Sequence, residues 1–263
     1  MTQYNDTKYG SLEETLNAIG KAAFVRFYYD FKDTTISTDA LAEKIIRESP
    51  RARSARQGFR IPRARHIFAH GQELEALKII IASERVDLDF RLRAKEILKK
   101  EEHDRLAAQD IIEEHGFIES LNSDVVYSTP SSFEYDNTPK APKAISSVET
   151  KRYPRSRAVA KNALGKACFM CEVSEHHTLF KRKNSTINYT EPHHLVPLHA
   201  AEMFPNVDLD REQNVVSLCS MCHNWLHYGS DIDTILRPLY EKRCDLLRSI
   251  GINITYEQLK KLY

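Results

Sequence analysis

The chain has 263 residues, 41% of them apolar, and its 38 Lys and Arg nearly balance 37 Asp and Glu, for a formal net charge of +1. This length exceeds what one ordinary core needs and predicts two domains with a connector. The sequence shows neither the roughly 18 consecutive apolar residues that span a bilayer nor an apolar signal-peptide core, so we expect a cytoplasmic protein without membrane contact. The near-zero net charge neither favours nor excludes nucleic acid, and local charge clusters must decide that question.

The N-terminal part of the chain predicts a series of helices. Ser11 followed by Glu14 is a capping-box pattern, and Pro50 ends the second predicted helix. Apolar residues recur at helical spacing in five stretches, residues 12–27, 38–49, 61–68, 74–81 and 90–98. We therefore expect residues 1–118 to form a helical domain, all-helical from residue 8 onward.

Residues 119–150 differ in composition from the segments on either side. Ser, Thr, Pro, Asn and Asp dominate, and Pro130, Pro139 and Pro142 fall in this stretch. Such a composition is typical of a linker or a loosely ordered loop. A short helix from Ala158 to Leu164 is expected beyond it, within a C-terminal domain assigned to residues 151–263.

Four of the five cysteines form two C-x-x-C pairs, Cys168 with Cys171 and Cys219 with Cys222. In a reducing compartment this pattern indicates metal binding rather than disulfides. Four thiolates complete a tetrahedral site that suits a structural zinc, although the insert between the pairs is longer than in common zinc ribbons. The alternative is four buried or chance cysteines. We expect Cys244, in a helical stretch, to be a plain core residue.

Histidines occur in two arrangements that suit metal-assisted chemistry. His223 and His227 are four residues apart, so a helix places both imidazoles on one face, where they can grip one ion. His193 and His194 are adjacent in a β-like stretch, where neighbours point to opposite faces. One of them can bind the ion while the other faces substrate. Phosphodiester hydrolysis needs this division, with a metal that polarises the phosphate and a neutral imidazole that takes a proton from water.

The segments "EPHHLVPL", Asn214 and "LCSMCHNWLH" resemble, in order and spacing, the HNH or ββα-metal nuclease family, in its restriction-type variant with a four-cysteine zinc site. The resemblance covers about residues 152–230. It implies an α+β chain, in which the helical domain and linker precede a ββα-metal domain. The loop "HAAEMFPNVDLDREQ" is longer and less Gly-rich than the family pattern, which puts the geometry of that loop in doubt.

The resemblance also implies roles for individual residues. His194 is expected to be the general base, and Asn214 to brace the loop that carries it. One catalytic divalent cation (Mg, Mn, Ni or Zn) is expected on His193, His223 and His227. One structural Zn²⁺ is expected on Cys168, Cys171, Cys219 and Cys222.

Each of these residues has a structural alternative. His193 can be a strand histidine that only forms hydrogen bonds, His227 can pack the end of its helix, and Asn214 can be an ordinary turn residue. Glu191 lies two residues before His193, and a role behind the metal ligands is as reasonable as a surface position. The adjacent pair His176 and His177 is interpreted as a surface feature.

Three basic clusters are candidates for contacts to DNA. Lys181, Arg182 and Lys183 are expected at a hairpin tip. Lys151, Arg152, Arg155 and Arg157 lie at the entrance of the C-terminal domain. The strongest cluster is Arg51, Arg53, Arg56, Arg60, Arg63 and Arg65, which together with the preceding helix resembles a helix-turn-helix reader. The alternatives are solvated charged turns and a basic surface that binds protein or nothing.

The function expected from these patterns is a metal-dependent DNA endonuclease in restriction or anti-phage defence. The alternatives are a mobile-element or repair nuclease with the same chemistry, and a non-catalytic zinc-dependent DNA-binding module. Cleavage of both strands would be easiest in a homodimer. The stretch Ile232–Tyr263 is expected to be helical, and either to supply that interface or to pack on its own domain.

Overall fold

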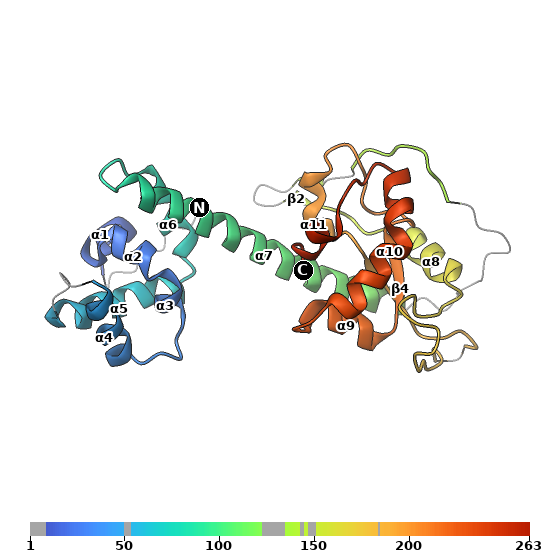
Figure 1. Ribbon diagram of the computed structural model, residues 1–263, viewed down its shortest axis with the longest axis horizontal. Helices are drawn as coiled ribbons and strands as arrows, with labels where there is room; N and C mark the ends of the chain where they lie inside the picture. Colours follow the sequence, from blue (N-terminus) through green and yellow to red (C-terminus); the bar gives the residue numbers. More distant parts are fainter. Residues whose placement is uncertain (1–8, 50–53, 123–134, 143–144, 147–150, 184) are drawn as a thin grey trace. The chain divides into compact units, whose positions relative to one another are not determined.

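The computed structural model describes residues 9–49, 54–122, 135–142, 145–146, 151–183 and 185–263. The chain divides into two compact units, Met1–Arg105 and Leu106–Tyr263. Helix α7 (Leu88–Asn122) runs through this boundary (Figure 1), which therefore lies earlier than the predicted domain end at residue 118.

The first unit is helical throughout its described residues. All five predicted helical stretches are helical, although the stretch 12–27 is divided at Gly20, whose φ of 90° is incompatible with a helix, and again at Phe27. The capping box at Ser11 is present as predicted, with Glu14 bonded back to the Ser11 backbone. The helices are α1 (Leu12–Ile19), α2 (Lys21–Arg26), α3 (Tyr28–Lys32), α4 (Thr38–Glu48), α5 (Ser54–Ala69), α6 (Glu73–Ala82) and the first part of α7.

Aromatic side chains form the centre of the first unit's core. Phe24 stacks on Phe31 and on Phe68, and Tyr28 meets Phe68 edge to face, so three helices share one aromatic cluster. Ala94 and Ile97 of α7 are buried in the same core. The start of α7 is therefore part of the first unit.

The second unit combines helices with a small antiparallel sheet, which makes the chain a mixture of α and β structure. Strands β3 (Glu191–His194) and β4 (Val215–Leu218) pair with Glu191 opposite Leu218 and His194 opposite Val215. Helix α9 (Ser220–Tyr228) follows β4 directly, giving the local order ββα. The other elements are β1 (Ile145–Ser146) paired with β2 (Lys151–Arg152), α8 (Arg157–Lys166), the 3-10 helix η1 (Leu198–Met203), α10 (Asp233–Ser249) and α11 (Tyr256–Lys260).

Both strands of the central pair are buried on every residue rather than alternately. The reason is that α8 and α9 both pack against β3 and β4, so neither face of the pair reaches water. Leu195, Val216 and Leu218 lie at the centre of this core. The predicted helix Ala158–Leu164 corresponds to α8.

The predicted linker 119–150 has three described parts, and the structure differs from a loosely ordered loop in each. Residues 145–146 form β1. Residues 119–122 continue α7, and residues 135–142 are bound to the second unit. Arg211 donates to the Thr138 carbonyl at 3.0 Å, and the Asp208 N–H donates to the Lys140 carbonyl at 2.9 Å. The stretches 123–134, 143–144 and 147–150 lie outside the described residues.

The C-terminal stretch from Ile232 is helical, as predicted, and packs into the core of its own unit through residues such as Leu239 and Leu259. Cys244 is only half-buried, which corrects its expected place in the core. Among the described residues, no helix is both long enough and apolar enough to cross a membrane.

Candidate functional site

Four buried side chains of the second unit converge with their donor atoms within 4.8 Å of one another, namely those of Glu114, His193, His223 and His227. The Nε2 atoms of His223 and His227 are 3.2 Å apart, and a Glu114 carboxylate oxygen lies 3.0 Å from Nε2 of His227. The other Glu114 oxygen is 3.3 Å from Nδ1 of His193. Four ligands at about 2.0 Å from a tetrahedral ion are about 3.3 Å apart, so this donor set fits one divalent cation.

The elements explain why three of these side chains meet. His223 and His227 are one helical turn apart on α9, so both rings face the same side. Cys219 caps α9 immediately after β4, and β4 pairs with β3 with His193 opposite Val216. The sequence predicted this juxtaposition of His193, His223 and His227, and the structure places them together.

A hydrogen bond to Tyr263 determines which nitrogen of His193 faces the cluster. The Tyr263 hydroxyl donates to the Leu195 carbonyl at 2.9 Å, and lies 2.8 Å from Nε2 of His193. Because the hydroxyl proton is already committed, Nε2–H of His193 is the donor in this second bond. Nδ1 of His193 is then unprotonated, buried and without a hydrogen-bond partner, as a metal ligand must be.

Glu191 orients His223 in the same way. Its carboxylate lies 2.7 Å from Nδ1 of His223 and accepts a second hydrogen bond from the Ser220 hydroxyl at 2.9 Å. With Nδ1–H donated to Glu191, Nε2 of His223 faces the cluster. The two interpretations left open for Glu191 are thereby resolved, since it lies behind a cluster histidine and is buried rather than on the surface.

The electrostatics of the cluster favour a cation. Burial lowers the pKa of His193 to about 4, against the opposing effect of Glu114. Burial also disfavours charge on His223, but the hydrogen bonds that it donates to the Glu114 and Glu191 carboxylates outweigh it and raise its pKa to about 9. Burial alone would raise the pKa of Glu114, yet the three imidazoles hold that pKa well below its usual range. A buried carboxylate anion surrounded by imidazoles is a site at which a divalent cation replaces a proton.

His194 is not one of the cluster's donors and pairs with Asp210 instead. Its Nε2 lies 2.9 Å from the Asp210 carboxylate, and the backbone N–H of Ser156 holds the other carboxylate oxygen at 2.7 Å. With Nε2–H donated to Asp210, Nδ1 of His194 is the nitrogen that can accept a proton. His194 lines one pocket together with His193 and Glu114.

Asn214 joins two parts of the loop that follows β3. Its side-chain oxygen accepts from the Val196 N–H at 2.8 Å, and its Nδ2 donates to the carbonyls of Val196 and Leu209, each at 2.9 Å. The residue is fully buried. These contacts connect Val196, two residues after β3, with Leu209, the neighbour of Asp210, which is where a brace for His194 has to act.

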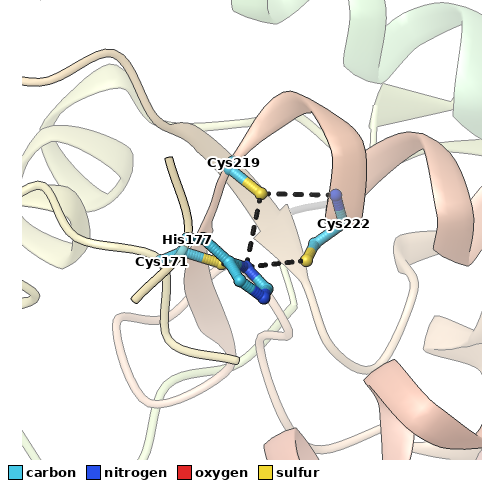
Figure 2. A group of neighbouring side chains, drawn as sticks. All are labelled: Cys171, His177, Cys219 and Cys222. Carbon is cyan, nitrogen blue, oxygen red and sulfur yellow. Dashed lines mark hydrogen bonds between the residues drawn. The ribbon is translucent and has the colours of Figure 1, made fainter. Parts of the chain in front are cut away.

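A second cluster of possible metal ligands in the second unit is formed by Cys171, His177, Cys219 and Cys222 (Figure 2). Nδ1 of His177 is 3.3 Å from the Cys171 and Cys222 sulfurs and 3.7 Å from the Cys219 sulfur. In a tetrahedral zinc site the distance between a nitrogen and a sulfur ligand is about 3.5 Å. The cluster can therefore hold a metal ion such as zinc.

This arrangement corrects the predicted four-cysteine set, because His177 occupies the place expected for Cys168. Cys168 is exposed, and it and Phe169 have positive φ angles of 51° and 53° in the turn that follows α8. His176 is exposed as expected, but its neighbour His177 is not a surface residue. The sequence signalled the ligand His177 only through its place in a histidine pair close behind the first C-x-x-C.

The thiols of this cluster also favour a cation. A hydrogen bond from Cys222 lowers the pKa of Cys171 to about 4, whereas burial raises the pKa of Cys219 and the bond to Cys171 raises that of Cys222. Three crowded thiols therefore do not all ionise by themselves. A bound cation removes this conflict because it stabilises every thiolate together.

The basic residues of α5 serve partly as structural groups. Arg65 donates to the Thr38 hydroxyl at 3.4 Å and to the backbone carbonyls of Asp33 and Ile36. The guanidinium of Arg63 lies 3.3 Å from the centre of the Phe59 ring. Arg60 is half-buried, while Arg51, Arg53 and the side chain of Arg56 lie outside the described residues.

The predicted hairpin tip is present, since Lys181 and Asn188 form an antiparallel bridge. Arg182 donates to Asn122 and to the Thr190 carbonyl, so it supports the hairpin, whereas Lys183 is exposed. The basic cluster at the domain entrance is divided. Arg157 is exposed, whereas the Arg155 side chain is buried in an ion pair with Asp110. The side chains of Lys151 and Arg152 are outside the described residues.

Comparisons of the chain with protein-family models, with curated proteins and with solved structures found no match. Sequence reasoning missed Glu114, Asp210, Tyr263 and His177. Glu114 lies in a stretch assigned to the N-terminal helical domain, and no local pattern distinguishes it from the many other acidic residues of α7.

Proposed function

We propose that this protein is a metal-dependent endonuclease that hydrolyses phosphodiester bonds of DNA. The observation that carries the proposal is the placement of His194 in one pocket with the buried histidine and carboxylate cluster. A site that only stabilised the fold would need no additional histidine held in a defined tautomer by a carboxylate. The local order β3, β4, α9 also supports the resemblance to HNH nucleases.

His193, His223 and His227 would hold the catalytic cation, with Glu114 beside them as the fourth donor in the arrangement described here. A divalent cation there supplies Lewis-acid polarisation of the phosphodiester and compensates the charge on the leaving oxygen. His194 accepts the proton of the attacking water at Nδ1. Asp210 keeps His194 in the required tautomer and stabilises the imidazolium that forms, while Asn214 holds the loop between them.

The cysteine cluster would hold a structural Zn²⁺. Cys219 and Cys222 lie at the start of α9, and Cys171 lies in the segment that pairs with β4 through the Glu172 N–H and the Ser217 carbonyl. A zinc ion here fixes the start of the helix that presents His223 and His227. Its contribution is rigidity of the site rather than chemistry.

DNA is the proposed partner, with the basic residues around α4 and α5 as the proposed reader and the cytoplasm as the proposed location. Restriction or anti-phage defence is the proposed setting, by resemblance, and a mobile-element or repair nuclease is the alternative with the same chemistry. A homodimer would place two sites on opposite strands. A non-catalytic zinc module is disfavoured by the pairing of His194 with Asp210.

The test is cleavage of plasmid and phage DNA by the full chain with Mg²⁺, Mn²⁺, Ni²⁺ or Zn²⁺. We expect nicking or cutting with at least one metal, and a loss of at least about 100-fold in His194→Ala, as for removal of a general base. His176→Ala is the matched control, because that side chain is exposed and outside both clusters. A His194→Ala protein as active as the parent would overturn the assigned base.

A further inference from the structure

We propose that the pocket beside the three cluster histidines is the binding site for the scissile phosphodiester, that Arg155 is its second cationic group, and that carboxylates of α7 fill this site in the state described. The assignment of the ligand as a phosphodiester rests on the proposed nuclease function. The pocket is lined by Asp110, Glu114, Arg155, His193, His194 and His199, among others.

Glu114 occupies the position that an anionic substrate group needs. Its side chain is 7% exposed, and one of its two oxygens is buried without a hydrogen-bond partner. Three histidines leave one position open on a tetrahedral ion, and a catalytic site uses that position for water or substrate. With Glu114 as the fourth donor the set is complete, and a phosphate oxygen gains a place only when this carboxylate leaves.

Asp110 likewise occupies the position beside Arg155 that an anionic substrate group would need. It pairs with the Arg155 guanidinium, and its other oxygen lies 3.2 Å from Nδ1 of His199 and accepts the His199 N–H at 3.0 Å. Glu113 adds a weaker contact to Arg155 at 3.6 Å. The Arg155 side chain is 6% exposed, and its Nε is buried without a hydrogen-bond partner. A planar guanidinium in this setting suits a phosphate as well as it suits a carboxylate.

The two carboxylates act together because they lie on one face of one helix. Asp110 and Glu114 are four residues apart on α7, so they stand one turn above the other. A movement of this part of α7 would therefore uncover the metal ligands and Arg155 at once. The same helix begins in the core of the first unit, where Ala94 and Ile97 are buried, so its two ends belong to different units. This continuity connects the first unit covalently to the part of α7 that carries Asp110 and Glu114.

The experiment measures binding of inorganic phosphate to the full chain, with Zn²⁺ in the cysteine cluster and Co²⁺ in the histidine cluster, by calorimetry and by the visible absorption of the bound Co²⁺. Glu114→Gln removes the negative charge with almost no change in shape and leaves the pair of Asp110 with Arg155 intact. We expect a gain in phosphate affinity of at least about tenfold, because a like charge facing the ligand costs more than about 1.4 kcal/mol. Glu119→Gln makes the same charge change at an exposed position of α7 and should have no effect.

A second pair of variants tests Arg155. Asp110→Asn, with Glu114 intact, should also raise phosphate affinity. In the Glu114→Gln background, Arg155→Lys keeps the charge but removes the planar fork, and should cancel most of the gain. Circular dichroism identifies any variant that does not fold. If only one of Glu114→Gln and Asp110→Asn folds, its phosphate affinity alone decides whether the inference holds.

The outcomes separate this inference from the proposed function. Phosphate binding no tighter in either Glu114→Gln or Asp110→Asn than in the parent would overturn the inference. With Zn²⁺ in the cysteine cluster, loss of the Co²⁺ absorption of the histidine cluster in Glu114→Gln would also overturn it, because Glu114 would then be a permanent ligand. Tighter phosphate binding without DNA cleavage by any variant would support the anion site and refute the nuclease. Tighter phosphate binding with faster cleavage in Glu114→Gln would support both.

Discussion

The Tyr263 hydroxyl lies 2.8 Å from Nε2 of His193 and donates its own proton to the Leu195 carbonyl. This pair of hydrogen bonds determines the tautomer of a buried histidine and thereby turns Nδ1 toward Glu114. The chemistry of the cluster depends on such partners as much as on the four donors themselves, because an imidazole that presents N–H cannot bind a cation.

The first prediction concerns this partner. Tyr263→Phe should lower the affinity of the histidine cluster for Mn²⁺ by about tenfold, because His193 loses the acceptor that holds its tautomer. Calorimetric titration measures the affinity, and Mn²⁺ is chosen because thiolates have little preference for it. Tyr240→Phe is the control, since that hydroxyl also donates to a backbone carbonyl, that of Ile254, away from the cluster. An equal loss in both variants would point to general destabilisation instead.

The second prediction concerns the ligands of the cysteine cluster. The parent should retain one tightly bound zinc after dialysis against a weak chelator, and His177→Ala and Cys222→Ser should lose it and melt at lower temperature. Cys168→Ser should retain the zinc, as should Cys244→Ser and His223→Ala, which lie outside the cluster. Elemental analysis gives the zinc content. Loss of zinc from Cys168→Ser together with its retention in His177→Ala would restore the four-cysteine set.

The third prediction concerns Asn214. Replacement by Ala removes three buried hydrogen bonds and leaves their backbone partners unsatisfied, so the free energy of unfolding should fall by about 3 kcal/mol. Urea denaturation measures the change. Asn224→Ala is the matched control, because that exposed side chain only donates to the Ser220 carbonyl on its own helix, and its effect should stay within about 0.5 kcal/mol. A change for Asn214→Ala as small as for the control would refute the bracing role.

The fourth prediction is a dependence of stability on pH. Burial raises the pKa of Asp110, but the hydrogen bonds to His199 and the charge of Arg155 more than offset this, so its net pKa is lowered. A lowered pKa in the folded state means that the stabilisation is fully present above the unfolded value of about 3.9, and is lost as the pH falls through the folded value.

The deficit of Asp110→Asn relative to the parent should accordingly be constant from pH 7 to about pH 5, at about 3 kcal/mol for a buried pair that has lost one charge, and should shrink at lower pH. Urea denaturation at each pH measures it, with Asp245→Asn as an exposed control. A deficit that grew on acidification would contradict the assigned direction of the shift.

Much of the second unit's local structure was predictable because it depends on near neighbours. The spacing of His223 and His227 places them on one face of any helix, and the adjacency of His193 and His194 separates them on any strand. Apolar periodicity and caps likewise predicted the helices of the first unit. The fourth ligand of the cysteine cluster was predicted wrongly, as Cys168 instead of His177. The turn after α8 has backbone angles that C-x-x-C spacing does not reveal.

The sequence by itself thus determined which residue types are grouped within one helix, one strand or one turn, since bonded geometry holds them together whatever the fold. Only the tertiary structure brought Glu114, Asp210 and Tyr263 to those groups, from segments distant along the chain. These three decide the charge of the metal cluster and the tautomers of His193 and His194. Their positions follow from how α7 and the C-terminal helices pack on the strand pair, which no short-range pattern encodes.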